Sequence, residues 1–222
     1  MRPKAKPASS YAATVTRSAE RSRHWDDAYS IRGAQGVSWF QSEPAVSLEL
    51  IDSLGLDPAT PVVDIGGGAS VLADRLLGKG YNDISVLDVS EVALNAGRRR
   101  VGDTPCVRWL HEDLLSWSPA RRYGLWHDRA VFHFLTDEDD QGVYLETMRS
   151  ALLPGGSLVL ATFAEDGPER CSGLPVTRYS VEQLRARLGS GFDLMVSRRE
   201  LHTTPSGAVQ PFTWIAGTVR SA

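Results

Sequence analysis

Three aspartates in this sequence lie in or just after apolar runs that have the length of a buried strand. Asp64 lies within VVDIGGGAS, Asp88 ends ISVLD, and Asp113 follows VRWLHE. The carboxyl ends of parallel strands meet at one edge of a sheet, so we expect these carboxylates to lie near one another. A carboxylate after the second strand can accept both hydroxyls of a ribose. The pattern therefore predicts a site for a ligand that contains a nucleoside.

A turn of three glycines, Gly66, Gly67 and Gly68, joins the first of these strands to the next helix. Glycine has no Cβ, so the backbone can pass close to a ligand, and the start of the helix presents free N–H groups. A dinucleotide fingerprint would need another glycine at position 71, which is Val71 here. The turn therefore argues against a nicotinamide-dependent oxidoreductase.

Apolar runs and helical patterns alternate regularly along the middle of the chain. The predicted strands cover 61–66, 83–89, 106–113, 123–130 and 157–163, with helices at 43–55, 69–80, 90–100, 137–156 and 180–189. Strands separated by helices of this length imply crossover connections and a parallel sheet. Two further β-like runs, 192–204 and 207–219, have no helix between them and must pair antiparallel. We therefore predict an α/β, doubly wound, Rossmann-like fold with about five parallel strands and a C-terminal hairpin.

The composition is that of an ordinary globular protein, with 42% hydrophobic and 23% charged residues and a net charge of −3. This balance argues against nucleic acid or a membrane surface as partner, because both favour clustered basic charge. The two cysteines, Cys106 and Cys171, suggest no disulfide framework, and we expect a cytoplasmic protein. No spacing among the histidines and cysteines suggests a metal site.

The N-terminal region differs from the rest of the chain. Residues 1–22 are basic and contain Pro3 and Pro7, so we expect a disordered tail there. Residues 23–222 are expected to form one domain, with an aromatic lid segment at about 23–57.

Over roughly residues 25–219 the chain resembles the class I S-adenosylmethionine (SAM) dependent methyltransferases. The resemblance lies in VVDIGGGAS, VLDVS, HEDLLSW, WHDRAVFHFLTD and LLPGGSLVLATF. It implies a seven-stranded sheet, SAM as the cofactor and S-adenosylhomocysteine (SAH) as the product. Ser70 stands where many members carry a third glycine. The strand end HDR lacks the N/D-P-P-Y/F signature of enzymes that methylate nucleobase or glutamine amides.

The resemblance also assigns roles to individual residues. Asp64 would organise the loop near the amino group of the cofactor, Asp88 would hold the ribose, and Asp128 would lie near the transferred methyl group. The remaining cofactor residues implied in this way are the three loop glycines and the adenine-side and lid residues, namely Gly66, Gly67, Gly68, Val89, Asp113, Leu114, Trp25 and Tyr29.

Residues for catalysis and for the acceptor are harder to assign. His127, Asp128 and His133 are the candidate catalytic residues, because they follow the fourth strand and could line one pocket wall. A structural role for His133 is the alternative. The candidate acceptor residues are Trp39, Phe40, His133 and Cys171. The aromatics among them could equally serve only to pack an N-terminal helix on the sheet.

The compact core favours transfer of the methyl group to a small molecule such as a thiol or another soft nucleophile. The opening WDDAY…SWFQ…SLELI is similar to that of thiol- and halide-methylating relatives. The alternative is a protein lysine methyltransferase, because the same opening and the ending HTTPSGAVQPFTW are similar to those of small lysine methyltransferases. A non-catalytic SAM-binding regulator is a third reading. We expect a monomer or weak homodimer.

Overall fold

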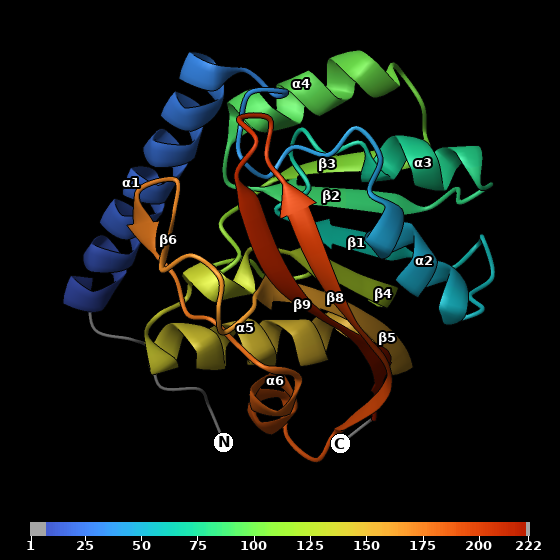
Figure 1. The fold of residues 1–222 in the computed structure, drawn as a ribbon. Coiled ribbons are helices and arrows are strands. Elements are labelled where there is room, and N and C mark those ends of the chain that lie inside the picture. Colours follow the sequence, from blue (N-terminus) through green and yellow to red (C-terminus); the bar gives the residue numbers. More distant parts are fainter. Residues whose placement is uncertain (1–7, 221–222) are drawn as a thin grey trace.

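The structure, a computed structural model, describes the backbone of residues 8–220 and the side chains of residues 16–220 (Figure 1). In chain order its elements are α1 (Ala8–Arg32), α2 (Ala45–Ser53), β1 (Val62–Ile65), α3 (Leu72–Gly78), β2 (Ile84–Asp88), α4 (Glu91–Val101), β3 (Val107–His111), β4 (Tyr123–Arg129), the short 3-10 helix η1 (Phe132–Phe134), α5 (Glu138–Ala151), β5 (Leu152–Phe163), β6 (Arg170–Cys171), β7 (Leu174–Pro175), α6 (Val181–Leu188), β8 (Phe192–Thr203) and β9 (Val209–Val219).

The main sheet has seven strands in the order β3-β2-β1-β4-β5-β9-β8. β1 to β5 pair in parallel, whereas β9 runs antiparallel to both β5 and β8. This confirms the predicted α/β fold and its C-terminal hairpin. The strand order reverses between β1 and β4, and ligands of such sheets bind in the crevice outside the carboxyl ends of the strands at that point. All three predicted aspartates lie at or near these ends.

Helices cover both faces of the sheet, because neighbouring residues of a strand point to opposite sides. Val62 belongs to an apolar cluster with α2, α3 and α4, and Val63 belongs to a second cluster with α5 and α6. Figure 1 shows α5 and α6 on one side of the sheet and α3 and α4 on the other. The strands are therefore held on both faces, and only their ends are open to a ligand.

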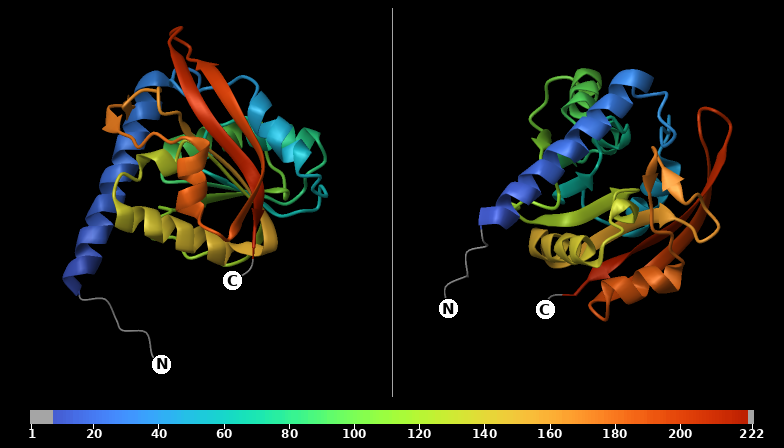
Figure 2. Two further views of the ribbon diagram at one scale, coloured as in Figure 1. Left: turned by 60° about the horizontal axis from the view of Figure 1, so that its bottom comes forward. Right: turned by 90° about the vertical axis from the view of Figure 1, so that its left-hand side faces the viewer.

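The long helix α1 corrects the prediction of a disordered tail. It begins at Ala8, so most of the segment 1–22 is helical, and only residues 1–7 lie outside the described part of the chain. Pro3 and Pro7 both precede the helix, and no proline or glycine occurs between Ala8 and Arg32 to interrupt it. The carboxylate of Asp26 fixes α1 to the start of α4 by accepting from Ser90 Oγ at 2.7 Å and from the Val92 N–H at 3.2 Å. Figure 2 shows α1 running along the side of the molecule, outside the two helical layers.

The loop after β5 contains a small hairpin that the sequence analysis missed. β6 and β7 pair antiparallel through the turn Ser172–Gly173, and both turn residues have positive φ angles of 49° and 81°. The dipeptide Ser-Gly was the available turn signal. No helix among the described residues is long and apolar enough to cross a bilayer.

Candidate functional site

A cavity of about 870 Å³, measured to its open mouth, lies at the carboxyl ends of the central strands under α1. Its wall comes from α1, from the strand ends and from the β6 hairpin. The lining residues include Arg21, Trp25, Tyr29, Trp39, Ile65, Gly66, Leu87, Asp88, Val89, Asp113, Leu114, Arg129, Ala130, Val131, Phe134 and Cys171. Most of the residues predicted for the cofactor and two of those predicted for the acceptor therefore meet in one space.

Asp88 is the buried acid of this cavity. One carboxylate oxygen accepts the backbone N–H of Ser90 at 2.8 Å. The pKa of Asp88 is raised to about 7, mainly by burial and in part by the nearby Asp64 carboxylate, while the Ser90 hydrogen bond acts in the opposite direction. Hydroxyl donors of a ligand would stabilise this carboxylate, because they favour its charged form.

Asp113 is held by the lid helix. Arg21 of α1 donates to one oxygen of Asp113 from Nε at 3.0 Å and from Nη2 at 2.5 Å. The other oxygen accepts the Leu115 N–H at 3.1 Å. Asp113 therefore joins α1 to the loop after β3, and Leu114 supplies an apolar surface beside it.

A second cavity, of about 530 Å³, adjoins the first and shares Tyr29, Trp39, Ile65, Gly66 and Arg129 with it. Its other lining residues include Phe40, Ser47, Asp64, Gly67, Ser70 and His127.

His127 and Asp64 form a buried pair at the base of this second cavity. Nδ1 of His127 lies 2.7 Å from Asp64 Oδ1, and Nε2 lies 3.0 Å from Ser47 Oγ. Both ring nitrogens therefore have partners, so His127 fixes the position of Asp64 and offers no free nitrogen as a base. Ser47 in α2 was not predicted, because nothing in the sequence signals a contact between α2 and β4.

The glycine loop is shaped by the groups around it. Gly66 has a φ of 66°, and a Cβ there would collide with the Val131 side chain. Gly68 has a φ of 30°, and a Cβ there would collide with the Asp88 carboxylate. Gly66 lines both cavities, whereas Gly68 lines neither and instead allows Asp88 to approach the loop. Gly66 thus forms part of the cavity walls, and Gly68 leaves room for the Asp88 carboxylate beside the loop.

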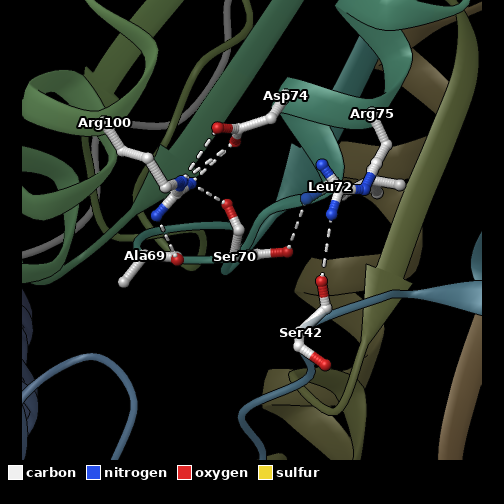
Figure 3. A network of polar contacts seen from close by, with 7 residues as sticks. All are labelled: Ser42, Ala69, Ser70, Leu72, Asp74, Arg75 and Arg100. Carbon is white, nitrogen blue, oxygen red and sulfur yellow. Dashed lines mark hydrogen bonds and ion pairs between the residues drawn. The ribbon is translucent and has the colours of Figure 1, made fainter.

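Polar contacts fix the outer side of this loop (Figure 3). Arg100 of α4 donates to the carbonyl oxygens of Ala69 at 2.8 Å and Ser70 at 2.5 Å, and it also pairs with Asp74 of α3. Arg75 donates to the Ser42 carbonyl at 3.2 Å. Arg100, in the last turn of α4, therefore holds the loop in place.

The lid aromatics pack on one another at the cavity mouth. Trp39 Nε1 donates to Tyr29 Oη at 2.9 Å, and the Trp25 ring meets Trp39 and Phe134 edge to face at 5.5 and 5.0 Å. Burial raises the pKa of Tyr29, so its hydroxyl stays protonated. The structure shows the packing alternative weighed from sequence, and these rings also line the cavity; a lid over the cofactor stays a prediction.

Asp128 does not reach either cavity, and its predicted contact with the methyl group and the cofactor has no support in the geometry. Its carboxylate is fully buried toward α5 and accepts from the N–H groups of Val131 at 2.8 Å and Phe132 at 3.1 Å and from Tyr144 Oη at 2.7 Å. Burial raises its pKa to about 6. The reason is strand alternation, because His127 points to the α2 side and Asp128 to the other side.

His133 also lies outside both cavities. Its ring is completely buried and packs against Phe134 and Phe163, with centroid distances of 4.5 and 4.7 Å. Nδ1 accepts the Phe163 N–H at 3.3 Å. Burial lowers the pKa of His133 to about 3, and the positive charge of Arg129 acts in the same direction. The geometry therefore matches the structural alternative considered for this histidine.

Arg129 is another lining residue that the sequence analysis missed. It is the last residue of β4, and it lines both cavities. Arg129 lies two residues after His127 in the same strand, so the alternation of side chains along a strand could have placed both on one face of the sheet.

Of the predicted acceptor residues, Trp39 and Cys171 line the first cavity, whereas Phe40 lines the second. Burial raises the pKa of the Cys171 thiol to about 11, so it is no nucleophile at neutral pH. Among the described residues, no group of three or more His, Cys, Asp or Glu could hold a metal ion.

Comparison with known proteins agrees with this geometry. Residues 62–156 match the family model described as a methyltransferase domain. The chain is 33% identical over 128 residues to trans-aconitate 2-methyltransferase of Sinorhizobium fredii, which covers 57% of this chain and 48% of that protein. It is 22% identical over 139 residues to malonyl-[acyl-carrier protein] O-methyltransferase 2 of Ilyobacter polytropus, covering 60% and 52%.

An eEF1A lysine and N-terminal methyltransferase of Mus musculus is 29% identical over 122 residues, covering 53% of this chain and 17% of that protein. The chain thus spans about half the length, or less, of these curated relatives.

Among solved structures, the 1,6-didemethyltoxoflavin-N1-methyltransferase of Burkholderia thailandensis, with its substrate and SAH bound, has a TM-score of 0.66 at 19% identity. That alignment covers 99% of this chain and 93% of the other. At this identity the likeness shows a shared fold. Residues 62–156 thus match a methyltransferase domain, and the chain shares its fold with solved methyltransferase structures.

Proposed function

We propose that this protein transfers a methyl group from SAM to a small-molecule acceptor. The observation that carries the proposal is the adjoining pair of cavities, with Asp88 in the wall of the first, Asp64 in the wall of the second and Gly66 in the walls of both. Asp88 is a buried carboxyl group with capacity to accept ribose hydroxyls, and the Gly66 position has no room for a Cβ. These features fit an adenosyl group next to an amino acid group.

The chain's own residues would bind the cofactor, orient the acceptor and exclude water. Asp88 would hold the ribose, Val89 and Leu114 would flank the adenine, and Asp64, fixed by His127, would face the amino group of the cofactor. When bound, SAM supplies a methyl group activated by the adjacent positive sulfur. Alignment of the acceptor with that methyl group can contribute up to about 7–11 kcal/mol. Trp25, Tyr29 and Trp39 would keep water away.

Two observations bear on the acceptor class. Both trans-aconitate and a malonyl group, named in two of the relatives, carry carboxylates. The lysine-methylating relative supports the alternative of a protein lysine acceptor. The positive guanidinium of Arg129 in the cavity wall disfavours that alternative, because it repels a lysine ammonium. Thiols stay within the proposed small-molecule class. The proposed location, the cytoplasm, and the proposed state, a monomer or weak homodimer, remain predictions.

The proposed function is tested by incubating the full chain with SAM and separate panels of thiols, carboxylic acids and cell-extract proteins. SAH release with one small-molecule panel is expected. Label from SAM in a protein band, with none in small molecules, would instead support the lysine alternative. Binding of SAM without turnover on any panel would favour a regulator.

Cofactor affinity is expected to depend on pH through Asp88. The pKa of the free carboxyl is about 7, whereas bound hydroxyl donors favour its charged form and so lower that pKa. Binding therefore releases a proton below pH 7, and the affinity for SAH falls as the pH falls, by up to about tenfold per pH unit. Above pH 7 this contribution is constant.

Calorimetric titration of SAH between pH 5.5 and 8.5, in two buffers of different ionisation enthalpy, measures the affinity and the proton count. Asp88→Asn serves as the control, because its amide does not titrate, and the ratio of the two affinities isolates Asp88 from the ligand's own titration. A ratio that stays constant over this range would contradict the assignment.

A further inference from the structure

Arg129 presents an unpaired positive charge to the cavity. Nη1 donates to the Trp39 carbonyl at 2.9 Å, and the guanidinium lies over the Phe212 ring at 4.6 Å. Nε and Nη2 are shielded from solvent and have no hydrogen-bond partner within the described part of the chain. Arginine stays protonated in proteins, so a charged side chain with two unpartnered donors lies in the wall of this space.

No carboxylate of the described residues neutralises this charge by direct contact. The nearest acid that influences it is Glu200. Glu200 is already engaged, because Oε1 accepts from Gln41 at 2.7 Å and Oε2 accepts from Trp214 at 2.8 Å. A shielded guanidinium without a counter-ion costs free energy. A group whose only role was structural would be better satisfied, so this arrangement points to a ligand that supplies the missing anion.

The backbone next to Arg129 is strained. Ala130 has a φ of 74°, a left-handed conformation that is strained for a residue with a Cβ. Its N–H is held by the Ala161 carbonyl of β5 at 3.0 Å. Such strain often occurs at ligand sites, where the surrounding structure maintains it. Here it fixes the direction of the chain immediately after Arg129, in the cavity wall.

The strand order places Arg129 away from the nucleoside end. The Asp88 and Asp113 carboxylates follow β2 and β3, on one side of β1. The guanidinium lies over Phe212 of β9, which is beyond β5 on the other side. The wall of the first cavity includes Trp39, Ala130, Val131, Phe134 and Cys171, and none of these side chains is a base at neutral pH. An acceptor that lies against this wall receives no base from it, so we expect it to arrive already deprotonated.

We propose that Arg129 binds a carboxylate of a small di- or tricarboxylate acceptor, and that a second carboxylate of the same molecule takes the methyl group. This inference rests on the proposed function. An oxygen of the second carboxylate forms a bond to the methyl carbon, the carbon–sulfur bond breaks, and its electron pair stays on the sulfur. The products are a methyl ester and neutral SAH, and no proton moves. Arg129 holds the other carboxylate through its free Nε and Nη2 donors.

The test uses the full chain, the variants Arg129→Met and Arg129→Lys, and the control Arg199→Met, whose arginine is exposed and pairs with Asp166. Malonate, glutarate and trans-aconitate, with their neutral amides, are titrated into protein saturated with SAH and into free protein. SAH affinity and the melting temperature are measured for every variant, and methylation is followed by ester formation.

The wild-type complex and the control are expected to bind at least one of the three acids about tenfold or more tighter than its amide, and to methylate it. Arg129→Met should abolish this preference, and Arg129→Lys should keep part of it, because a lysine preserves the charge but not the planar pair of donors. SAH affinity should change less than about threefold. The melting temperature of Arg129→Met should stay the same or rise by a few degrees, because an unpaired buried charge is removed.

Three results would overturn the proposal. These are equal binding of acids and amides, no binding of any acid, and a loss of SAH affinity in Arg129→Met as large as the loss of acid binding. The last would assign the guanidinium to the carboxylate of the cofactor. Failure of the wild-type chain to bind SAH would contradict the proposed function instead, and the titrations of free protein would then decide the role of Arg129 separately.

Discussion

Replacing Asp88 by Asn is expected to weaken SAH binding by about 100-fold while leaving the folded protein as stable as before or more so. Hydrogen bonds to a charged acceptor contribute about 1.5–3 kcal/mol each, and a ribose offers two hydroxyls. A loss of about 3 kcal/mol corresponds to roughly 100-fold in affinity. The Asn amide retains an oxygen for the Ser90 N–H but loses the negative charge.

Asp88→Asn is expected to weaken SAH binding but not the stability of the fold, because burial raises the pKa of Asp88 to about 7. At pH 8 the native state keeps a charge that burial disfavours, and Asn removes that cost. Calorimetry with SAH and thermal unfolding at pH 8 measure both effects. Asp103→Asn is the matched control, because Asp103 is exposed. A variant that binds SAH normally would show that Asp88 does not hold the ribose.

Replacing Asp128 by Ala is expected to destabilise the protein by about 3–5 kcal/mol and to lower the melting temperature by about 10 °C. The substitution leaves the N–H groups of Val131 and Phe132 and the hydroxyl of Tyr144 without their acceptor in the core. Each unsatisfied buried donor costs about 1–3 kcal/mol. Tyr144 also accepts from Trp126 Nε1 at 2.9 Å, so the disturbance extends into the α5 interface.

The decisive comparison is between stability and ligand binding. SAH affinity of the folded Asp128→Ala protein, measured well below its melting temperature, should change only a few-fold, because the carboxylate does not face either cavity. Asp128→Asn should recover part of the stability, since it keeps one acceptor oxygen. An Asp128→Ala protein with a normal melting temperature but no methyl transfer would restore the catalytic role predicted from sequence.

Local sequence patterns were sufficient for the fold and for the cofactor end of the site. A strand followed by a glycine turn and a helix is a contiguous feature, so Asp64, Gly66 and Asp88 could be placed at strand ends without knowing what packs around them. The lack of a helix between the last two β-like runs likewise required the antiparallel hairpin. The aromatics at 23–57 could also be named from the sequence, but which of them contact one another was decided by the tertiary structure.

The tertiary structure decided which side chains of the fourth strand face the ligand. His127, Asp128 and Arg129 are adjacent in sequence, but the pleat sends Asp128 toward Tyr144 and leaves its neighbours on the other side. Whether Arg129 finds a counter-ion depends on Glu200, about seventy residues away, being occupied by Gln41 and Trp214. The sequence by itself therefore determined the strand ends and the glycine turn at which the cofactor is proposed to bind. Which buried charged side chain lacks a partner depends on contacts between distant elements, and only the tertiary structure shows these contacts.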